Sequence, residues 1–231
     1  MHAALAPPAP IAFPDVSQAL DEPNGLLAAG GALTPEWLLA AYRRGIFPWY
    51  GEGDPLLWWS PAPRMVLFPS EVRVRRSLAK RLRNGGFTTT FDHAFDAVID
   101  ACAAERVGSG GTWIDAEMAL AYRRLHALGH AHSVETWRHG ELVGGLYGIA
   151  LGQVFFGESM FSRCADASKV ALVTLARRLE AHGFPLIDCQ MHTAHLASMG
   201  AREIARETFI DYLEKSVDQP TPAGLWPPEP P

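Results

Sequence analysis

The sequence predicts an α+β fold in which helices pack against a mixed, mainly antiparallel β-sheet. Residues 132–162 have the pattern of three strands, joined by turns at His139-Gly140 and Gly152-Gln153. Residues 166–183 have the pattern of a helix, and FPLIDCQ (184–190) that of a further strand. Helical segments precede this meander. Because the strands are grouped rather than alternating with helices throughout, the order favours α+β over a fully parallel sheet.

Two domains are expected along the 231 residues. A small N-terminal α+β domain over residues 1–62 would precede a catalytic domain over residues 63–231, with Pro61-Ala62-Pro63 as the connection. Residues 1–12 and 217–231 are rich in Pro and Ala and lack hydrophobic periodicity. They are expected to be extended or disordered tails.

Composition narrows the class of protein. Hydrophobic residues make up 48% and charged residues 19%, which is typical of a globular protein, and the net charge of −5 provides no general attraction for nucleic acid. The three cysteines (Cys102, Cys164 and Cys189) are too few and too widely spaced for a disulfide framework or a structural zinc site. With no signal peptide and no run of about 18 apolar residues, we expect a cytoplasmic protein without a membrane partner.

The N-terminal part contains one well-marked helix. Thr34-Pro35-Glu36 is typical of a helix start, and Gly45 is expected to end the helix in a left-handed conformation. The following residues, 46–64, contain three tryptophans and several prolines. Such a loop is either a packed connection or a binding surface.

Residues 71–84 carry six basic residues and one acid. On a helix at about 100° per residue, Arg73, Arg76, Lys80 and Arg83 would share one face, with Arg81 beside them, and Leu78 would lie opposite. A solvated surface is the simple interpretation. Four aligned cations without an interleaved acid favour contact with a nucleic-acid backbone.

Two more helices are expected before the meander. Residues 91–106 place Phe95, Val98, Ile99 and Cys102 inward, and residues 115–128 end at Gly129. The intervening GSGG (108–111) is not a phosphate-binding P-loop, because no Gly-Lys-Ser/Thr follows it. Asp166 is predicted to cap the long helix that follows the meander, and residues 192–200 to form a short helix.

The candidate site of chemistry lies where polar residues interrupt apolar strands. Glu158 lies within VFFGESMF, and Asp188 and Gln190 end FPLIDCQ. Ionised carboxylates avoid such strands unless an interaction requires them there. Strand alternation puts Asp188 and Gln190 on one face and Ile187 on the other. The structural alternatives are a strand-end cap for Asp188 and a buried arginine partner for Glu158.

Family resemblance sharpens these expectations. The order of elements is similar to that of the GCN5-related N-acyltransferases, although the CoA-binding pattern of that fold is absent. Further motifs occur together and in order: YRRGIFPW, LWWSPAPR, GTWIDAEM, FFGESMFS, DASK, LIDCQ and HLASMGA. Over roughly residues 13–215 the chain resembles the bacterial leucyl/phenylalanyl-tRNA–protein transferases.

The resemblance implies an activity, partners and site residues. The activity is transfer of Leu or Phe, less often Met, from aminoacyl-tRNA to proteins that begin with Arg or Lys, which marks them for degradation as an N-degron. No cofactor or metal is implied, and a monomer is expected. Catalysis is assigned to Asp188 and Gln190. From the residues themselves, an amide is too weak a base to hold a proton, so Gln190 would aim the incoming amine. Glu158 would attract the ammonium of the donor aminoacyl group or that of the acceptor's N-terminus. The remaining implied residues form the side-chain pocket (Leu146, Phe155, Met160 and Ile187) and the surroundings of the tRNA 3′ end (Trp49, Trp113 and Tyr42).

Two other classes of function remain open from the sequence. Cys189 with His192 and His195 could form a cysteine-nucleophile site, or less readily a zinc site, although adjacent residues rarely supply both groups. A non-catalytic RNA-binding module would use the basic stripe with Trp49 and Trp113. Net acidity and carboxylates in apolar strands argue against this module as the whole function.

Overall fold

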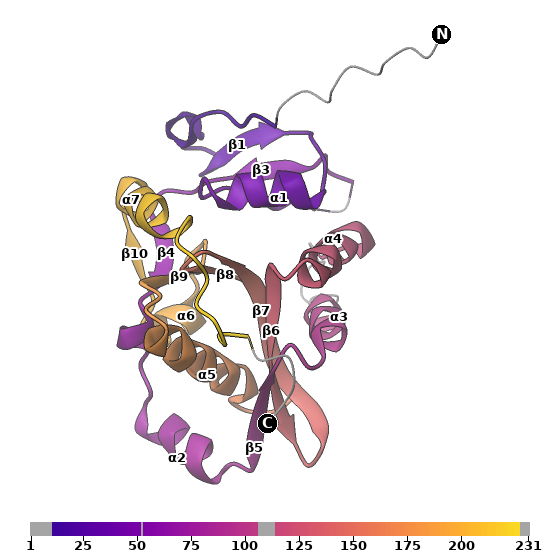
Figure 1. The fold of residues 1–231 in the computed structure, drawn as a ribbon, viewed down its shortest axis with the longest axis vertical. Helices are drawn as coiled ribbons and strands as arrows, with labels where there is room; N and C mark the ends of the chain where they lie inside the picture. The colour runs from indigo at the N-terminus through magenta and orange to yellow at the C-terminus, as the bar shows by residue number, and fades with distance from the viewer. Residues whose placement is uncertain (1–10, 52, 106–113, 227–231) are drawn as a thin grey trace.

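The computed structural model describes residues 11–51, 53–105 and 114–226, and these contain two β-sheets (Figure 1). The smaller sheet has the strand order β1-β3-β2, and its strands are β1 (Leu26–Ala29), β3 (Leu57–Trp59) and β2 (Phe47–Pro48). Helix α1 (Pro35–Tyr42) packs beside it. As predicted, Thr34 caps α1, with its hydroxyl accepting from the Trp37 amide, and Gly45 has a positive φ of 72°.

The larger sheet has seven strands in the order β10-β4-β9-β8-β7-β6-β5. Only β8 and β9 are parallel, so the sheet is mixed and mainly antiparallel, and the predicted α+β fold is confirmed. The strands are β4 (Arg64–Leu67), β5 (Phe87–Phe91), β6 (Ala131–Arg138), β7 (Glu141–Leu151), β8 (Val154–Ser162), β9 (Leu186–Asp188) and β10 (Arg202–Ile204).

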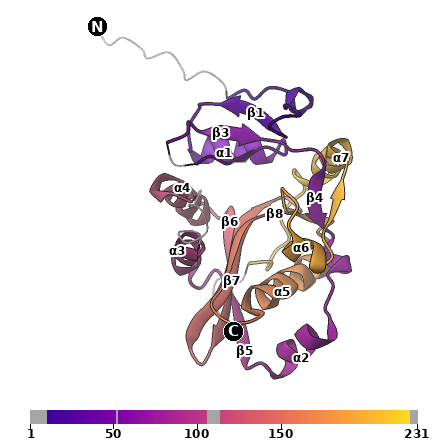
Figure 2. The same ribbon diagram turned by 180° about the vertical axis from the view of Figure 1, so that it is seen from behind.

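Helices cover both faces of this sheet (Figures 1 and 2). Helix α5 (Ala167–Ala181) lies across one face, and α3 (Phe95–Glu105) and α4 (Ala116–Ala127) lie across the other. Strand alternation along β7 sorts the side chains, since Leu146 joins the core under α5 and Tyr147 joins the core under α3 and α4. The remaining helices are α2 (Arg76–Asn84), α6 (Ala194–Ser198), α7 (Arg206–Ser216) and the short 3-10 turns η1 (Val16–Gln18) and η2 (Pro69–Glu71).

Several local predictions are confirmed and others are wrong. The β6–β7 turn is at His139-Gly140, both with positive φ, and Gly152 turns β7 into β8. Helix α2 begins at Arg76 rather than residue 71, because the backbone amide of Arg73 instead donates to the carbonyl of Met199. Asp166 holds the predicted N-cap position, but its left-handed backbone makes no side-chain cap, and its carboxylate pairs with Lys169 at 2.8 Å.

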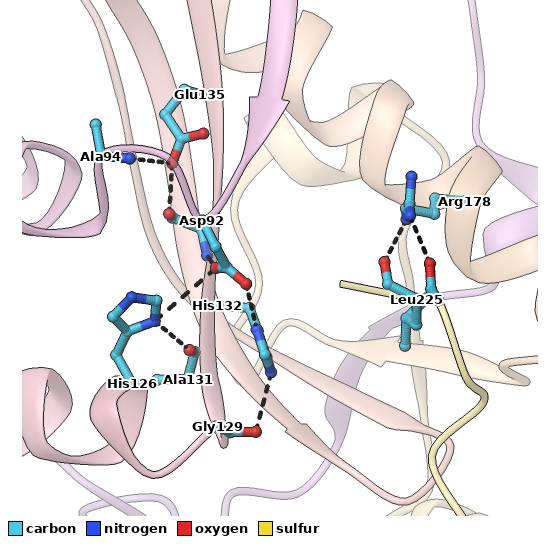
Figure 3. Close-up of polar contacts among 11 residues, drawn as sticks. Asp92, Ala94, His126, Gly129, Ala131, His132, Glu135, Arg178 and Leu225 are labelled. Atoms are coloured by element: carbon cyan, nitrogen blue, oxygen red, sulfur yellow. Dashed lines mark hydrogen bonds and ion pairs between the residues drawn. The ribbon is translucent and has the colours of Figure 1, made fainter. Parts of the chain in front are cut away.

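The chain after α7 is not the free tail that its composition suggested. Residues 217–226 pack against the sheet, with Leu225 buried and the Trp226 ring stacked 3.9 Å from the ring of His132. Arg178 donates to the carbonyls of Gly224 and Leu225 (Figure 3). Two large apolar side chains and a guanidinium anchor therefore outweigh the Pro-rich composition. Residues 227–231, like 1–10 of the predicted N-terminal tail, lie outside the described residues.

Figure 3 also shows a polar cluster on β6 that serves the fold. His132 contacts Asp92 at 2.7 Å, and the buried Glu135 carboxylate accepts from Ser133 and the Ala94 amide. The Glu135 carboxylate also accepts from the hydroxyl of Thr90. These side chains satisfy one another. The first sheet ends at Trp59 and the second begins at Arg64, and the division at residue 62 stays a prediction. Across the described residues, every helix is too short or too polar to span a bilayer.

Candidate active site

A cavity opens where β8 and β9 separate. The two strands pair only from Val154–Phe156 to Leu186–Asp188, after which β9 stops and β8 continues to Ser162. A cavity of about 360 Å³ occupies the space beyond this point. This volume is in the range of pockets that enclose small organic groups.

The cavity has an apolar wall. Leu146, Phe155, Met160 and Ile187, which the resemblance nominated together, all line it. Helix α5 adds Leu172 and Leu175, which the sequence reasoning did not single out. Their helical spacing of three residues is the usual core pattern, so nothing in the sequence distinguished them from the ordinary core.

Glu158 is the extra residue of a β-bulge in β8. Ser159 pairs with Tyr147 and Gly157 with Gly148, so Glu158 has no partner on β7. A bulge re-aims the side chain of its unpaired residue, and such irregularities gather beside active sites. Here the bulge turns a carboxylate out of an apolar strand and into the cavity lining.

The Glu158 carboxylate is held by three polar groups. Tyr122 of α4 donates to one oxygen at 2.8 Å, and the side-chain amide of Gln190 donates to the other at 3.2 Å. The Tyr42 hydroxyl lies 2.6 Å behind that of Tyr122. Desolvation raises the pKa of Glu158 to about 7, while the tyrosine hydrogen bonds and Arg64 act in the opposite direction. Glu158 can therefore exchange a proton near neutral pH.

Gln190 is fixed by its backbone as well as its side chain. It has a left-handed φ of 56°, and its carbonyl accepts from the Met65 amide at 3.2 Å. A positive φ is costly for a residue other than glycine and is retained where the surroundings impose it. Because the amide nitrogen is turned to Glu158, the side-chain oxygen stays available, and no donor among the described residues contacts it.

Asp188 lies behind Gln190 and forms a buried ion pair with Arg64. The Arg64 Nε and a terminal nitrogen contact the two carboxylate oxygens at 2.8 and 2.7 Å, and both side chains are fully buried. One oxygen also accepts from the backbone amide of Gln190 at 3.0 Å. Asp188 therefore acts on the site through the backbone of Gln190. The predicted contact between the two side chains is absent, and the hydrogen bond from the Gln190 backbone amide to the Asp188 carboxylate takes its place.

Side chains alternate between the cavity and the opposite face along β9, but the alternation ends just after this strand. Ile187 and Cys189 line the cavity, whereas Asp188 points to the opposite face. Regular alternation would also point the Gln190 side chain away from the cavity. Because its backbone is left-handed, Gln190 instead lines the cavity. The sequence assigned both Ile187 and Asp188 to the site although alternation puts them on opposite faces of the strand. In the structure only Ile187 faces the cavity.

The residues predicted around a tRNA 3′ end are placed differently from one another. Trp49 lines the cavity, is 39% exposed, and packs edge-on against Trp59 at 5.4 Å. Tyr42 is fully buried, so it has no free face for a nucleotide, and it supports Tyr122 instead. Trp113 lies outside the described residues.

The predicted basic stripe is present in part. Arg76, Lys80, Arg81 and Arg83 lie on α2 and are exposed, while Leu78 docks the helix. Arg73 is exposed too, but it precedes α2 and is not on the helical face. Arg81 lies 3.8 Å from Asp166 at the start of α5, which places α2 next to that helix.

The alternatives built on Cys189 lack the required geometry. Burial, together with the nearby Asp188 charge, raises the pKa of the Cys189 thiol, and its Sγ lies 3.8 Å from the Ile187 carbonyl. A nucleophilic cysteine needs the opposite shift. The described residues contain no group of three His, Cys, Asp or Glu side chains placed to hold a metal ion. His195 lines the cavity, and its buried Nε2 has no hydrogen-bond partner among the described residues.

The family models and the curated relatives agree on one family. A family model described as leucyl/phenylalanyl-tRNA protein transferase matches residues 66–214, and one for the N-terminal domain of the same family matches residues 31–62. A protein of that name from Chromohalobacter salexigens is 70% identical over 95% of this chain and 86% of its own length. One from Azoarcus sp. is 65% identical over 92% of this chain and 91% of its own. Among solved structures, a GCN5-related N-acetyltransferase from Kribbella flavida covers 74% of this chain and 61% of its own at 13% identity, with a TM-score of 0.35.

Proposed function

Because this chain belongs to the leucyl/phenylalanyl-tRNA–protein transferase family, we propose that it transfers Leu or Phe, and less often Met, to proteins that begin with Arg or Lys. The donor is the aminoacyl-tRNA, and the product is a peptide bond at the acceptor's N-terminus that creates an N-degron. We propose that the enzyme acts as a monomer in the cytoplasm.

The observation that supports this proposal is a cavity that is apolar along one wall and polar at one end. Leu146, Phe155 and Ile187 offer a donor side chain no hydrogen-bonding group. This selects Leu and Phe, because polar side chains would lose their bonds to water without replacement. Met160 is unbranched and adapts to side chains of different shape.

The polar end matches the needs of ester aminolysis. The acceptor nitrogen attacks the ester carbonyl, the new C–N bond forms, and the bond from that carbon to the ribose oxygen breaks. Starting from an ammonium, two protons must leave the nitrogen, and one proton must reach the ribose oxygen. Glu158 draws in the acceptor ammonium and, with a pKa near 7, accepts its proton. The free oxygen of Gln190 then aims the neutral amine at the ester. The second proton leaves the nitrogen as the C–N bond forms and passes to the departing ribose oxygen.

Asp188 and Arg64 act by position in this scheme. Their ion pair is rigid, and Asp188 passes that rigidity to Gln190 through the backbone amide at 3.0 Å. Neither touches the reacting atoms. Asp188 is accordingly a positioning residue, and Gln190 and Glu158 are the residues that meet the substrate.

The donor tRNA meets the enzyme at two further places. Trp49, exposed at the cavity, offers a face on which the terminal adenine can stack, worth about 1–3 kcal/mol. The basic residues of α2, with Arg73 beside them, contact the sugar-phosphate backbone. The negative charge of Glu158 favours a cationic N-terminal residue on the acceptor, whereas the charge of Asp188 is neutralised by Arg64.

A transfer assay tests this function. The enzyme is incubated with labelled Phe-tRNA and either a peptide that begins with Arg, its N-acetylated form, or a matched peptide that begins with Gly. Label should move to the free Arg peptide and not to the acetylated one, with little reaching the Gly peptide. Bound tRNA without transfer would instead identify a binding module and remove the catalytic roles of Glu158 and Gln190.

A further inference from the structure

A second hollow, of about 590 Å³, lies at the β6–β7 turn. Three of its lining residues are basic, namely Arg138 and His139 at the end of β6 and Arg163 just after β8. One acid, Glu141, lines it as well. Among the described residues, no ion pair joins Glu141 to either arginine. The hollow therefore keeps an excess of positive charge.

Arg138 carries the clearest sign of a missing partner. Its Nε is buried and has no hydrogen-bond partner among the described residues. Its guanidinium lies 5.7 Å from the ring of Phe87, which holds the group in place from the β5 side. A buried donor on a charged group is normally paired, so this nitrogen calls for an acceptor from outside the chain.

Arg163 provides a second guanidinium at the same hollow. One of its terminal nitrogens donates to the Leu142 carbonyl at 3.2 Å, and the group lies 5.4 Å from the Phe161 ring. These contacts fix its direction and use one of its five N–H donors. The remaining donors are available, since Arg163 is exposed. Two oriented guanidiniums suit the oxygens of a phosphate.

Two short segments of the chain connect the hollow to α2. Phe87, which supports Arg138, begins the strand directly after α2, and Asp166, three residues beyond Arg163, faces Arg81 of α2 at 3.8 Å. The same strands also lead to the cavity. Leu146 on β7 and Met160 on β8 line the cavity. They lie three to five residues from the hollow, or about 10–17 Å along an extended chain.

We propose that Arg138 and Arg163 bind a backbone phosphate of the donor tRNA near its 3′ end, with His139 at the border of the site. The inference rests on the proposed function, because a tRNA whose aminoacyl group occupies the cavity has its last phosphates near that cavity, and the hollow lies about 10–17 Å away along the strands. It extends the nucleic-acid surface from α2 to the β6–β7 turn. The contact adds affinity without reading sequence.

The test compares two double variants that each remove two positive charges. Arg138→Gln/Arg163→Gln changes the hollow. Arg124→Gln/Arg177→Gln is the matched control, since both of its arginines are exposed and lie on α4 and α5. Equilibrium binding of Phe-tRNA is measured from about 50 to 200 mM salt. Transfer from 3′-phenylalanyl-adenosine, which has no backbone phosphate, is measured alongside.

The hollow variant should bind tRNA about 10-fold more weakly at the lowest salt. Its slope of log affinity against log salt should fall by about 0.7–0.9 for each phosphate that the variant no longer binds. The control variant should keep the wild-type slope, and transfer from phenylalanyl-adenosine should be unchanged in both. An unchanged slope in the hollow variant, or an equal fall in the control, would overturn the phosphate site. Arg163→Gln alone, at an exposed position, repeats the test if the double variant unfolds.

Failure of the proposed function would look different. In that case wild-type enzyme would transfer nothing from either donor, whatever its salt dependence. If both donors react and only the hollow variant's salt slope stays at the wild-type value, the transferase assignment stands and the phosphate site falls.

Discussion

Arg64 and Asp188 form a fully buried, doubly hydrogen-bonded ion pair, although 124 residues separate them in the chain. Arg64 also donates to the Gly45 carbonyl at 3.0 Å, and its guanidinium lies between the rings of Phe47 and Phe209. Asp188, which accepts from the Gln190 backbone amide, is thus linked through Arg64 to Gly45, just after the end of α1. A buried pair of this kind adds little net stability, but losing one member is costly.

The first prediction separates stability from catalysis at this pair. Asp188→Ala leaves the Arg64 charge buried and unpaired, so unfolding free energy should fall by about 3–5 kcal/mol. Arg64→Met/Asp188→Leu removes both charges, and its stability should return to within about 1–2 kcal/mol of wild type. Chemical denaturation measures both. If the double variant is stable yet transfers slowly, Asp188 has a positioning role. Wild-type transfer in a stable double variant would leave the pair with a structural role only.

The second prediction concerns the side-chain oxygen of Gln190. Gln190→Asn keeps an amide and suits the left-handed φ of 56°, since Asn tolerates that region better than most residues. Its shorter side chain withdraws the oxygen by about one bond length. We expect the melting temperature to hold and kcat to fall about 100-fold, which a misplacement of about 1 Å can cause. An Asn variant with wild-type kcat would contradict the aiming role.

The third prediction is a pH limb set by Glu158. Desolvation raises its pKa to about 7, so kcat/KM should rise as pH increases through 7 and the carboxylate ionises. Glu158→Gln should lower the rate and remove this limb. Tyr122→Phe deletes a hydrogen bond that lowers the Glu158 pKa, so it should move the limb to higher pH.

Stability provides a readout of Glu158 that does not depend on the substrate amine, which itself titrates near pH 8. The folded pKa of about 7 lies above the ordinary glutamate value of 4.5. Ionising Glu158 therefore destabilises the fold as pH rises across that window. Relative to wild type, Glu158→Gln should gain stability above pH 7 and not below pH 4.5. A stability difference that does not change with pH would show that the pKa is not raised.

Glu158, Asp188 and Gln190 could be predicted from the sequence because each is a polar residue in an apolar segment. Neighbouring residues alone are enough to show that contrast. The role of Arg64 could not be predicted from the sequence. Its strand, β4, has only four residues, all of them buried, so no alternation of polar and apolar residues marks it as a strand. The bulge at Glu158 depends on the β7 register. The left-handed turn at Gln190 depends on Met65, which is distant in the chain. Tyr122 looked like part of an ordinary amphipathic helix.

The same limit explains the errors in the fold. Residues 71–75 fit a helical pattern, but the Arg73 amide finds the Met199 carbonyl, and tertiary contact outweighs propensity. The Pro-rich end of the chain packs because Leu225 and Trp226 find apolar partners on the sheet. Periodicity predicted the meander and α5 well, because their patterns are long.

The last prediction concerns donor choice. Leu146 lies on the cavity wall, buried and paired with Met160 on the neighbouring strand. Leu146→Phe shortens the cavity, so it should reduce kcat/KM for Phe-tRNA more than for Leu-tRNA, by a factor of about 10–200 in their ratio. Leu146→Ala should move the ratio the other way. The ratio of the two kcat/KM values is its own control. Lost stability would lower kcat/KM for both donors alike, whereas a smaller cavity would lower it mainly for the larger donor side chain. Equal losses for the two donors in Leu146→Phe would mean that this cavity does not hold the donor side chain.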